Sequence, residues 1–96
     1  MKRNSPKSGV KKRRVKMSFA RTKANTVSLV GDFNQWDPKR HPMKMREEGT
    51  WEKTVVLSPG KYEYKFMVDG TWENDPQNSE LLYNRYGTLN NVLTVS

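Results

Sequence analysis

Trp36 and Trp72 are the residues whose types and positions most directly suggest chemistry. Trp36 lies in the polar segment GDFNQWDP at 31–38, and Trp72 follows a turn signal at Asp69 and Gly70. A tryptophan in a polar loop is costly to leave in water unless it packs or binds something. A flat aromatic ring suits the apolar face of a sugar, and polar neighbours can bond to the sugar hydroxyls. The pattern favours a sugar-binding surface, and packing at the ends of the fold is the open alternative.

Residues that could catalyse a reaction are few. His41 is the single histidine, and there is no cysteine, so neither a shared metal site nor a thiol nucleophile is expected. Asp69, Glu73 and Asp75 cluster in the sequence, but glycoside hydrolysis needs two carboxylates that face each other across a cleft. Surface acids that form turns are the simpler interpretation. We therefore expect no enzyme activity, no catalytic residue, no metal and no cofactor.

Length and composition bound the class of protein. A chain of 96 residues without cysteine is expected to form one domain that is held by packing alone. No apolar run approaches the roughly 20 residues that a membrane helix needs, and the N-terminus has no apolar signal-peptide core. These observations predict a cytoplasmic protein with no membrane partner.

The net charge of +8 is concentrated at the N-terminus. Residues 1–14 hold seven basic residues and no acid, whereas the rest of the chain holds 11 basic and 10 acidic residues. Residues 1–13 are polar and basic, so we expect a disordered tail there and a folded domain over 14–96. Such a tail can contact polyanions non-specifically, or it can serve only as a solubilising segment or linker.

The element that must position the chemistry is the stretch from Lys61 to Trp72. Tyr62, Tyr64, Phe66 and Val68 alternate with polar residues, which is typical of a half-buried strand. Further strands are expected at about 14–21, 26–31, 42–47, 50–57 and 92–95, with a polar connection over 73–88. Short strands separated by turn signals predict an all-β, immunoglobulin-like antiparallel β-sandwich. Its expected core residues are Val15, Phe19, Leu29, Trp51, Val55, Tyr64, Phe66 and Val68.

Three motifs together resemble a known family. GDFNQWDP at 31–38, the segment from Gly49 to Pro76 and YGTLNNVLTV at 86–95 are similar to the glycogen-recognition carbohydrate-binding module, family 48. Modules of this family occur in the beta subunit of AMP-activated protein kinase and ahead of the catalytic domain of branching and debranching enzymes. The resemblance covers about residues 14–96 and implies an early-set β-sandwich, as in isoamylase N-terminal domains, that binds α-1,4-glucan without catalysis.

The resemblance also implies which residues contact the sugar. Two tryptophans sandwich the glucan in kinase-type members, and a lysine, a threonine and an asparagine assist them. These roles fall on Trp36, Trp72, Lys65, Thr88 and Asn90. The kinase-type module has a leucine where this chain has Tyr86, and a tyrosine there could stack on the sugar. The expected partner is an α-glucan polysaccharide or oligosaccharide, with a glucan-active enzyme or kinase as a further partner. The alternative is a scaffold domain that docks onto such an enzyme without its own sugar binding.

Overall fold

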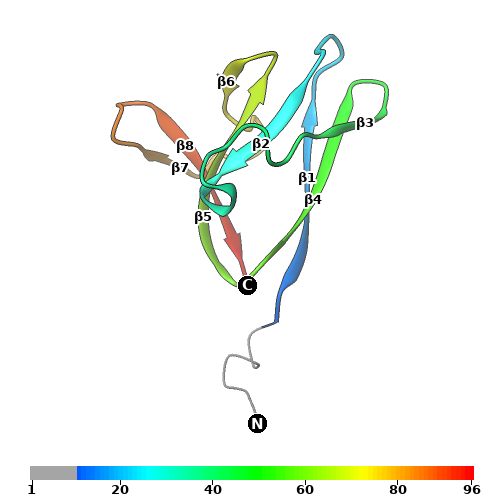
Figure 1. Ribbon diagram of the computed structural model, residues 1–96. Helices are drawn as coiled ribbons and strands as arrows, with labels where there is room; N and C mark the ends of the chain where they lie inside the picture. Colours follow the sequence, from blue (N-terminus) through cyan, green and yellow to red (C-terminus); the bar gives the residue numbers. More distant parts are fainter. Residues whose placement is uncertain (1–10) are drawn as a thin grey trace.

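The computed structural model describes residues 11–96 and consists almost entirely of antiparallel strands (Figure 1). The elements in this range are β1 (Arg13–Ala20), β2 (Val27–Gly31), the 3₁₀ turn η2 (Asp32–Asn34), β3 (Lys44–Glu47), β4 (Thr50–Leu57), β5 (Gly60–Val68), β6 (Thr71–Glu73), β7 (Leu81–Tyr83) and β8 (Leu89–Val95). Figure 1 shows two layers, with β1, β4 and β3 in one and the other strands in the second. The predicted all-β antiparallel sandwich is confirmed. Within the described residues, no helix is long and apolar enough to cross a membrane.

The two sheets differ in size, and in the larger one the strand β5 pairs with two different strands along one edge. The smaller sheet has the order β1-β4-β3, and the larger has the order β2-β5-β8-β7, with β6 also paired to β5. Along one edge of β5, the residues up to Tyr64 pair with β8, whereas those from Phe66 onward pair with β6. β2 occupies the other edge of β5. Lys65 therefore lies where β5 changes partner.

The core lies between the sheets and follows the alternation predicted for β5. Tyr64, Phe66 and Val68 are buried, and Tyr62 is half-buried against the same core. Phe66 packs on Phe19 from β1 in the opposite sheet, with 4.7 Å between ring centroids. Burying a phenylalanine contributes about 1.5–3 kcal/mol. These contacts hold the two sheets together.

Seven of the eight expected core residues are buried, and Val15 is the exception. Val15 is only half-buried because it lies near the start of β1, which pairs with β4 alone and has one open edge. Trp51 is core, as expected, and its indole Nε1 donates a hydrogen bond of 3.0 Å to the carbonyl oxygen of Arg21.

Three boundaries differ from the sequence predictions. The expected polar connection over 73–88 contains the end of β6 and all of β7, and the last strand begins at Leu89 instead of residue 92. β7 shows no alternation because all three of its residues are exposed, and β8 carries Asn90 and Asn91 near its start. Arg13 belongs to β1, so it is not part of a tail. The rest of the expected disordered tail, residues 1–10, lies outside the described residues.

Candidate functional site

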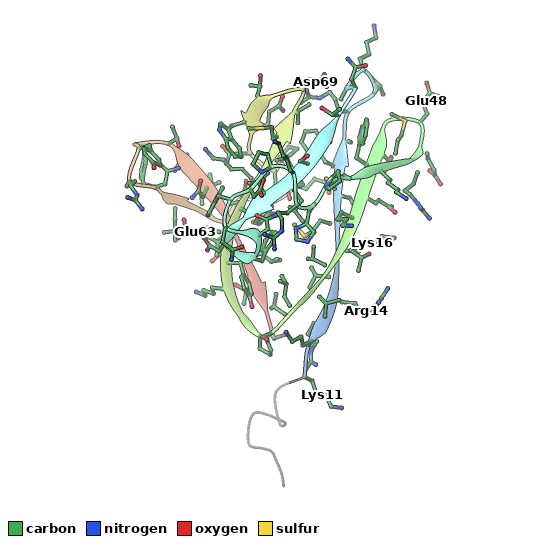
Figure 2. The ribbon with its side chains drawn as sticks, in the orientation of Figure 1. Lys11, Arg14, Lys16, Glu48, Glu63 and Asp69 are labelled. Atoms are coloured by element: carbon green, nitrogen blue, oxygen red, sulfur yellow. The ribbon has the colours of Figure 1, made fainter. Side chains whose placement is uncertain are left out.

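One open groove brings together all six residues that the sequence analysis singled out. It has a volume of about 740 Å³ and lies on the outer face of the larger sheet. The six expected residues in its lining are Trp36, Lys65, Trp72, Tyr86, Thr88 and Asn90, and the others are Asp32, Glu63, Tyr83, Asn84 and Arg85. Figure 2 shows Glu63 on the opposite side of the molecule from Arg14 and Lys16, which project from β1 in the smaller sheet.

The change of partner along β5 explains where the groove forms. Lys65 stands between the ladder to β6, which carries Trp72, and the ladder to β8, which carries Asn90. Trp72 pairs with Met67, which is two residues from Lys65 and therefore on the same face. The β7–β8 hairpin then extends Tyr86 and Thr88 beyond the ladder. Five site residues thus reach one face from three segments of the chain.

The loop that carries Trp36 leaves β2 through a close approach at Gly31. A Cβ atom on Gly31 would lie 2.5 Å from the carbonyl oxygen of Glu63 and 2.8 Å from the Cβ of Tyr64. Only glycine fits this contact between two backbones. The buried Asn34 then fixes the loop, because its Oδ1 accepts from the N–H of Gly31 and its Nδ2 donates to the carbonyl of Leu29.

Trp36 is held in an unusual backbone conformation. Its φ is 58°, and that of Gln35 is 57°, so two successive non-glycine residues are left-handed. Such a conformation costs on the order of 1–3 kcal/mol for a bulky residue and persists only where neighbours enforce it. Trp36 Nε1 donates to Asp32 Oδ1 at 2.9 Å, and Asp32 Oδ2 accepts from the N–H of Glu63 at 2.7 Å. The indole N–H is therefore used, and the ring face is what Trp36 offers to a ligand.

The two indoles contact each other at an angle. The ring centroids of Trp36 and Trp72 are 6.1 Å apart, and the ring planes are inclined by 66°. A sugar held between two parallel rings needs about 7–8 Å, since each contact takes roughly 3.5–4 Å. The sandwich implied by the family resemblance is therefore not the arrangement in this structure. The indoles form an angled surface in the edge-to-face geometry that aromatic pairs prefer.

A connected set of polar side chains forms the other part of the groove. Lys65 Nζ donates to Thr88 Oγ1 at 3.1 Å, and Asn84 Nδ2 donates to both Thr88 Oγ1 and Asn90 Oδ1. Asn90 Nδ2 in turn donates to Glu63 Oε1 at 3.0 Å. Lys65 and Asn90 are nearly buried, at 8% and 6% exposure, so their polar groups are held in place before any ligand arrives. The role of Glu63 could not be predicted because its contact with Asn90 joins distant segments. The role of Asn84 was also missed, because its hydrogen bonds, all within six residues, depend on the shape of the hairpin turn.

Tyr86 is among the exposed residues of the groove. It is 81% exposed, and the guanidinium of Arg85 lies 5.8 Å from its ring centroid. A hydrogen bond from the N–H of Tyr86 to Asn84 Oδ1 fixes its backbone within the hairpin turn. Tyr86 therefore presents a ring to solvent from a fixed backbone position.

The acids that could have formed a catalytic pair have separate structural partners. Asp69 accepts hydrogen bonds from the N–H groups of Thr26 and Asn25, which lower the pKa of its carboxyl group. Glu73 forms a salt bridge with Arg21, and Asp75 accepts a hydrogen bond from the hydroxyl of Tyr64. All three serve to hold turns and strands together.

His41 contacts Asn34, the residue that fixes the loop carrying Trp36. Asn34 Nδ2 is 2.8 Å from His41 Nδ1, and burial, followed by the charges of Lys53 and Arg40, lowers the pKa of the imidazole. Across residues 11–96, no three His, Asp or Glu side chains are grouped so that they could hold a metal ion.

Comparison with known families shows which family this chain belongs to. The family model described as the glycogen recognition site of AMP-activated protein kinase matches residues 14–96. The chain belongs to this family. It is the family that the three sequence motifs predicted, and the match covers both sheets and the whole groove.

Relatives of this glycogen recognition domain are much longer proteins. The chain is 44% identical over 73 residues to Protein FLOURY ENDOSPERM 6, chloroplastic, of Oryza sativa subsp. japonica, and 41% identical over 73 residues to Protein PTST homolog 2, chloroplastic, of Arabidopsis thaliana. Each alignment covers 76% of this chain but 13% of the relative. A 1,4-alpha-glucan branching enzyme of Rhodopseudomonas palustris (strain BisA53) is 47% identical over 45 residues, or 47% of this chain and 6% of the enzyme.

A solved structure supports the same fold. The crystal structure of maltogenic amylase from S. marinus matches with a TM-score of 0.67 and 26% identity, over 86% of this chain and 13% of that chain. The glycogen recognition domain described here therefore shares its sandwich with a segment of a much larger protein.

Proposed function

We propose that this domain binds α-1,4-glucan, as glycogen, starch or a maltooligosaccharide, on the angled surface of Trp36 and Trp72. The observation that carries the proposal is the 66° inclination of the two indoles in a groove that also holds a polar wall. The polar wall is the hydrogen-bonded set of side chains formed by Glu63, Lys65, Asn84, Thr88 and Asn90. Successive glucose units of an α-1,4 chain turn relative to one another, whereas a β-1,4 chain is a flat ribbon. Two inclined faces suit a curved chain, with one sugar on each indole and hydroxyls directed toward Lys65, Thr88 and Asn90.

The groove is open, so the affinity should be modest. We expect a Kd between about 1 μM and 1 mM, which corresponds to about −8 to −4 kcal/mol. Because the polar wall is already hydrogen-bonded, little of the binding free energy is lost in ordering it. The stacking on Trp36 and Trp72 should supply most of the favourable free energy, since tryptophan is frequent among binding hot spots.

The proposal includes no catalytic step. Asp32 and Glu63 are the carboxylates of the groove, and each has a positioning contact. Asp32 orients the indole of Trp36, and Glu63 orients the amide of Asn90. A glycosidase instead needs one carboxylic acid to give its proton to the leaving oxygen and a second carboxylate opposite it. Purified protein should release no reducing sugar from glycogen.

Substitution of the indoles tests the proposal. Trp72→Ala should weaken maltoheptaose binding by about 2 kcal/mol or more, and Trp36→Ala should do the same. Trp72 is the cleaner site, because it is 44% exposed and its indole N–H has no hydrogen-bond partner among the described residues. Trp72→Phe is the conservative control, since it keeps a smaller stacking face and should lose less. Normal maltoheptaose binding by correctly folded alanine variants would show that Trp36 and Trp72 do not form a sugar-binding surface.

A second candidate function is docking onto a glucan-active enzyme or a kinase. The observation that favours it is that the chain spans 13% of its plant relatives, so in those proteins the equivalent domain is joined to much more chain. Docking should survive Trp72→Ala, whereas sugar binding should not. Co-sedimentation of the Trp72→Ala variant with a candidate enzyme, in the absence of glucan, separates the two functions.

The location of this protein follows the same proposal. The sequence alone predicts a cytoplasmic protein, whereas the names of the two plant relatives place those proteins in the chloroplast. We propose that this domain acts in whichever aqueous compartment holds its glucan. Imaging of the tagged full-length protein beside a glucan stain tests this, and separation of the two signals would contradict it.

A further inference from the structure

The amide of Asn84 has all of its hydrogen-bonding capacity used. Its Oδ1 accepts from the N–H groups of Tyr86 and Thr88, at 2.9 and 3.1 Å. Its Nδ2 donates to Thr88 Oγ1 at 2.7 Å and to Asn90 Oδ1 at 3.0 Å. Because backbone N–H groups can only donate, the orientation of the amide is determined by chemistry.

This orientation fixes the direction of the neighbouring hydrogen bonds. A hydroxyl has one proton and two lone pairs, and Thr88 Oγ1 already accepts from Asn84 Nδ2 and from Lys65 Nζ. Both lone pairs are therefore occupied. Within residues 11–96, the Thr88 proton has no further acceptor in hydrogen-bond geometry. It can only be given to a group outside the protein.

We propose that Asn84 is a positioning residue of the groove, which shapes the hairpin turn and makes the Thr88 hydroxyl a donor to the sugar. This inference rests on the proposed glucan binding and deepens it. The ligand atom next to Thr88 must accept a hydrogen bond, as a sugar hydroxyl oxygen does. Asn84 itself need not touch the ligand, because it acts through Thr88 and Asn90.

Asn84→Asp separates the two tasks of the amide. The aspartate keeps an oxygen for the N–H groups of Tyr86 and Thr88, so the turn should survive. Its second oxygen replaces Nδ2 and faces Thr88 Oγ1, so the Thr88 proton turns toward the carboxylate instead of the ligand. Near neutral pH, maltoheptaose affinity should fall about tenfold, the scale of one lost hydrogen bond.

The variant should recover at low pH, which a purely structural role does not predict. The ordinary pKa of an aspartic acid is about 3.9, and the N–H groups of Tyr86 and Thr88 lower it by favouring the carboxylate. The protonated side chain, which regains a donor for Thr88, therefore forms below that pH. The Kd of Asn84→Asp divided by that of the wild type should fall toward one as the pH is lowered below about 4. The other ionisable groups of the groove are common to both proteins, so the ratio removes their contribution. They are Asp32, Glu63, Lys65, Tyr83, Arg85 and Tyr86.

Matched variants complete the experiment. Gln77→Glu adds a negative charge at an exposed position outside the groove lining and should bind like the wild type. Thr88→Ser keeps the hydroxyl and should lose less affinity than Thr88→Val, which should lose about as much as Asn84→Asp. If near-UV circular dichroism shows that Asn84→Asp does not fold, the comparison of Thr88→Ser with Thr88→Val tests whether the Thr88 hydroxyl donates to the sugar.

The outcomes are distinct. A ratio near one at every pH, or equal binding by Thr88→Ser and Thr88→Val, overturns the inference. A ratio that stays high at a pH where the carboxyl at position 84 is protonated shows that the lost donor is not the cause, and also overturns it. If the wild type itself does not bind maltoheptaose, the proposed function fails before Asn84 is tested.

Discussion

Asn34 Nδ2 lies 2.8 Å from His41 Nδ1, and this contact fixes the protonation state of the imidazole. Asn34 Oδ1 accepts from the N–H of Gly31, so the group that faces His41 is the NH₂, which can only donate. His41 Nδ1 must therefore be an unprotonated acceptor. The same contact links His41 to the loop that carries Trp36.

This relationship predicts a loss of stability in mild acid. Burial lowers the pKa of His41 below its ordinary value of 6.5. Above that pH the imidazole is neutral in both states; below it, the unfolded chain takes a proton that the folded chain resists. The free energy of unfolding should therefore fall as the pH drops from 6.5 toward the lower folded pKa.

Urea denaturation over this pH range checks the prediction. His41→Gln is the control, because its amide oxygen can still accept from Asn34 but does not titrate. The wild type should lose more stability than His41→Gln over this interval. The Asp69 carboxyl contributes only at lower pH, since its pKa is lowered from 3.8. Equal losses in the two proteins would contradict the assigned role of His41.

Phe66→Ala should be among the most destabilising substitutions in the domain. Phe66 is fully buried and packs on both Phe19 and Tyr64. Truncation of a buried phenylalanine costs about 3–5 kcal/mol, which is much of the stability of a small domain. Chemical denaturation measures the change. Val56→Ala, on the exposed face of β4, is the control and should change stability little.

Tyr86→Leu should keep or improve binding to cyclic and branched glucans. Leucine is the residue that the family resemblance implies at this position, and it can push into a curved chain. Tyr86 is 81% exposed, so the change should leave stability unaffected. Titration with a cyclodextrin and with maltoheptaose gives the comparison. A marked loss of affinity for both ligands would mean that the tyrosine ring itself is required.

Removal of the N-terminal residues before β1 should affect polyanions and not glucans. Those residues are mostly basic or small polar, and Arg14 and Lys16 lie on the side of the molecule away from Glu63 (Figure 2). Deletion of residues 1–12 should weaken heparin binding and its dependence on salt, because each phosphate- or sulfate-like contact releases counterions. Maltoheptaose affinity should not change. A tenfold loss of maltoheptaose affinity would place part of the sugar site in that segment.

The sequence predicts much of the fold and the position of the groove. The alternation from Tyr62 to Val68 is confirmed because one face of β5 packs against the opposite sheet. Trp36 and Trp72 were identified by being aromatic in polar surroundings, and they do lie together. The sugar contacts themselves stay a prediction.

The parts that the sequence does not reveal depend on tertiary contacts. β7 has three exposed residues, so no hydrophobic period identifies it. Asn84 and Asn34 look like ordinary turn residues, yet each becomes a hydrogen-bonding centre because the folded turn brings residues four to six positions away against its amide. The angle between the indoles also cannot be deduced from spacing, because it arises where β6 and the segment that follows η2 converge.

The most direct test of the central claim is titration of the wild-type domain with maltoheptaose and with cellohexaose, followed by tryptophan fluorescence. Trp51 is buried in the core, so a change in emission reports on Trp36 and Trp72. We expect saturable binding of maltoheptaose with a Kd between about 1 μM and 1 mM, unchanged at high salt, and no saturation with cellohexaose. Absence of maltoheptaose binding, or equal binding of both sugars, would contradict the claim that the angled indoles select a curved α-glucan.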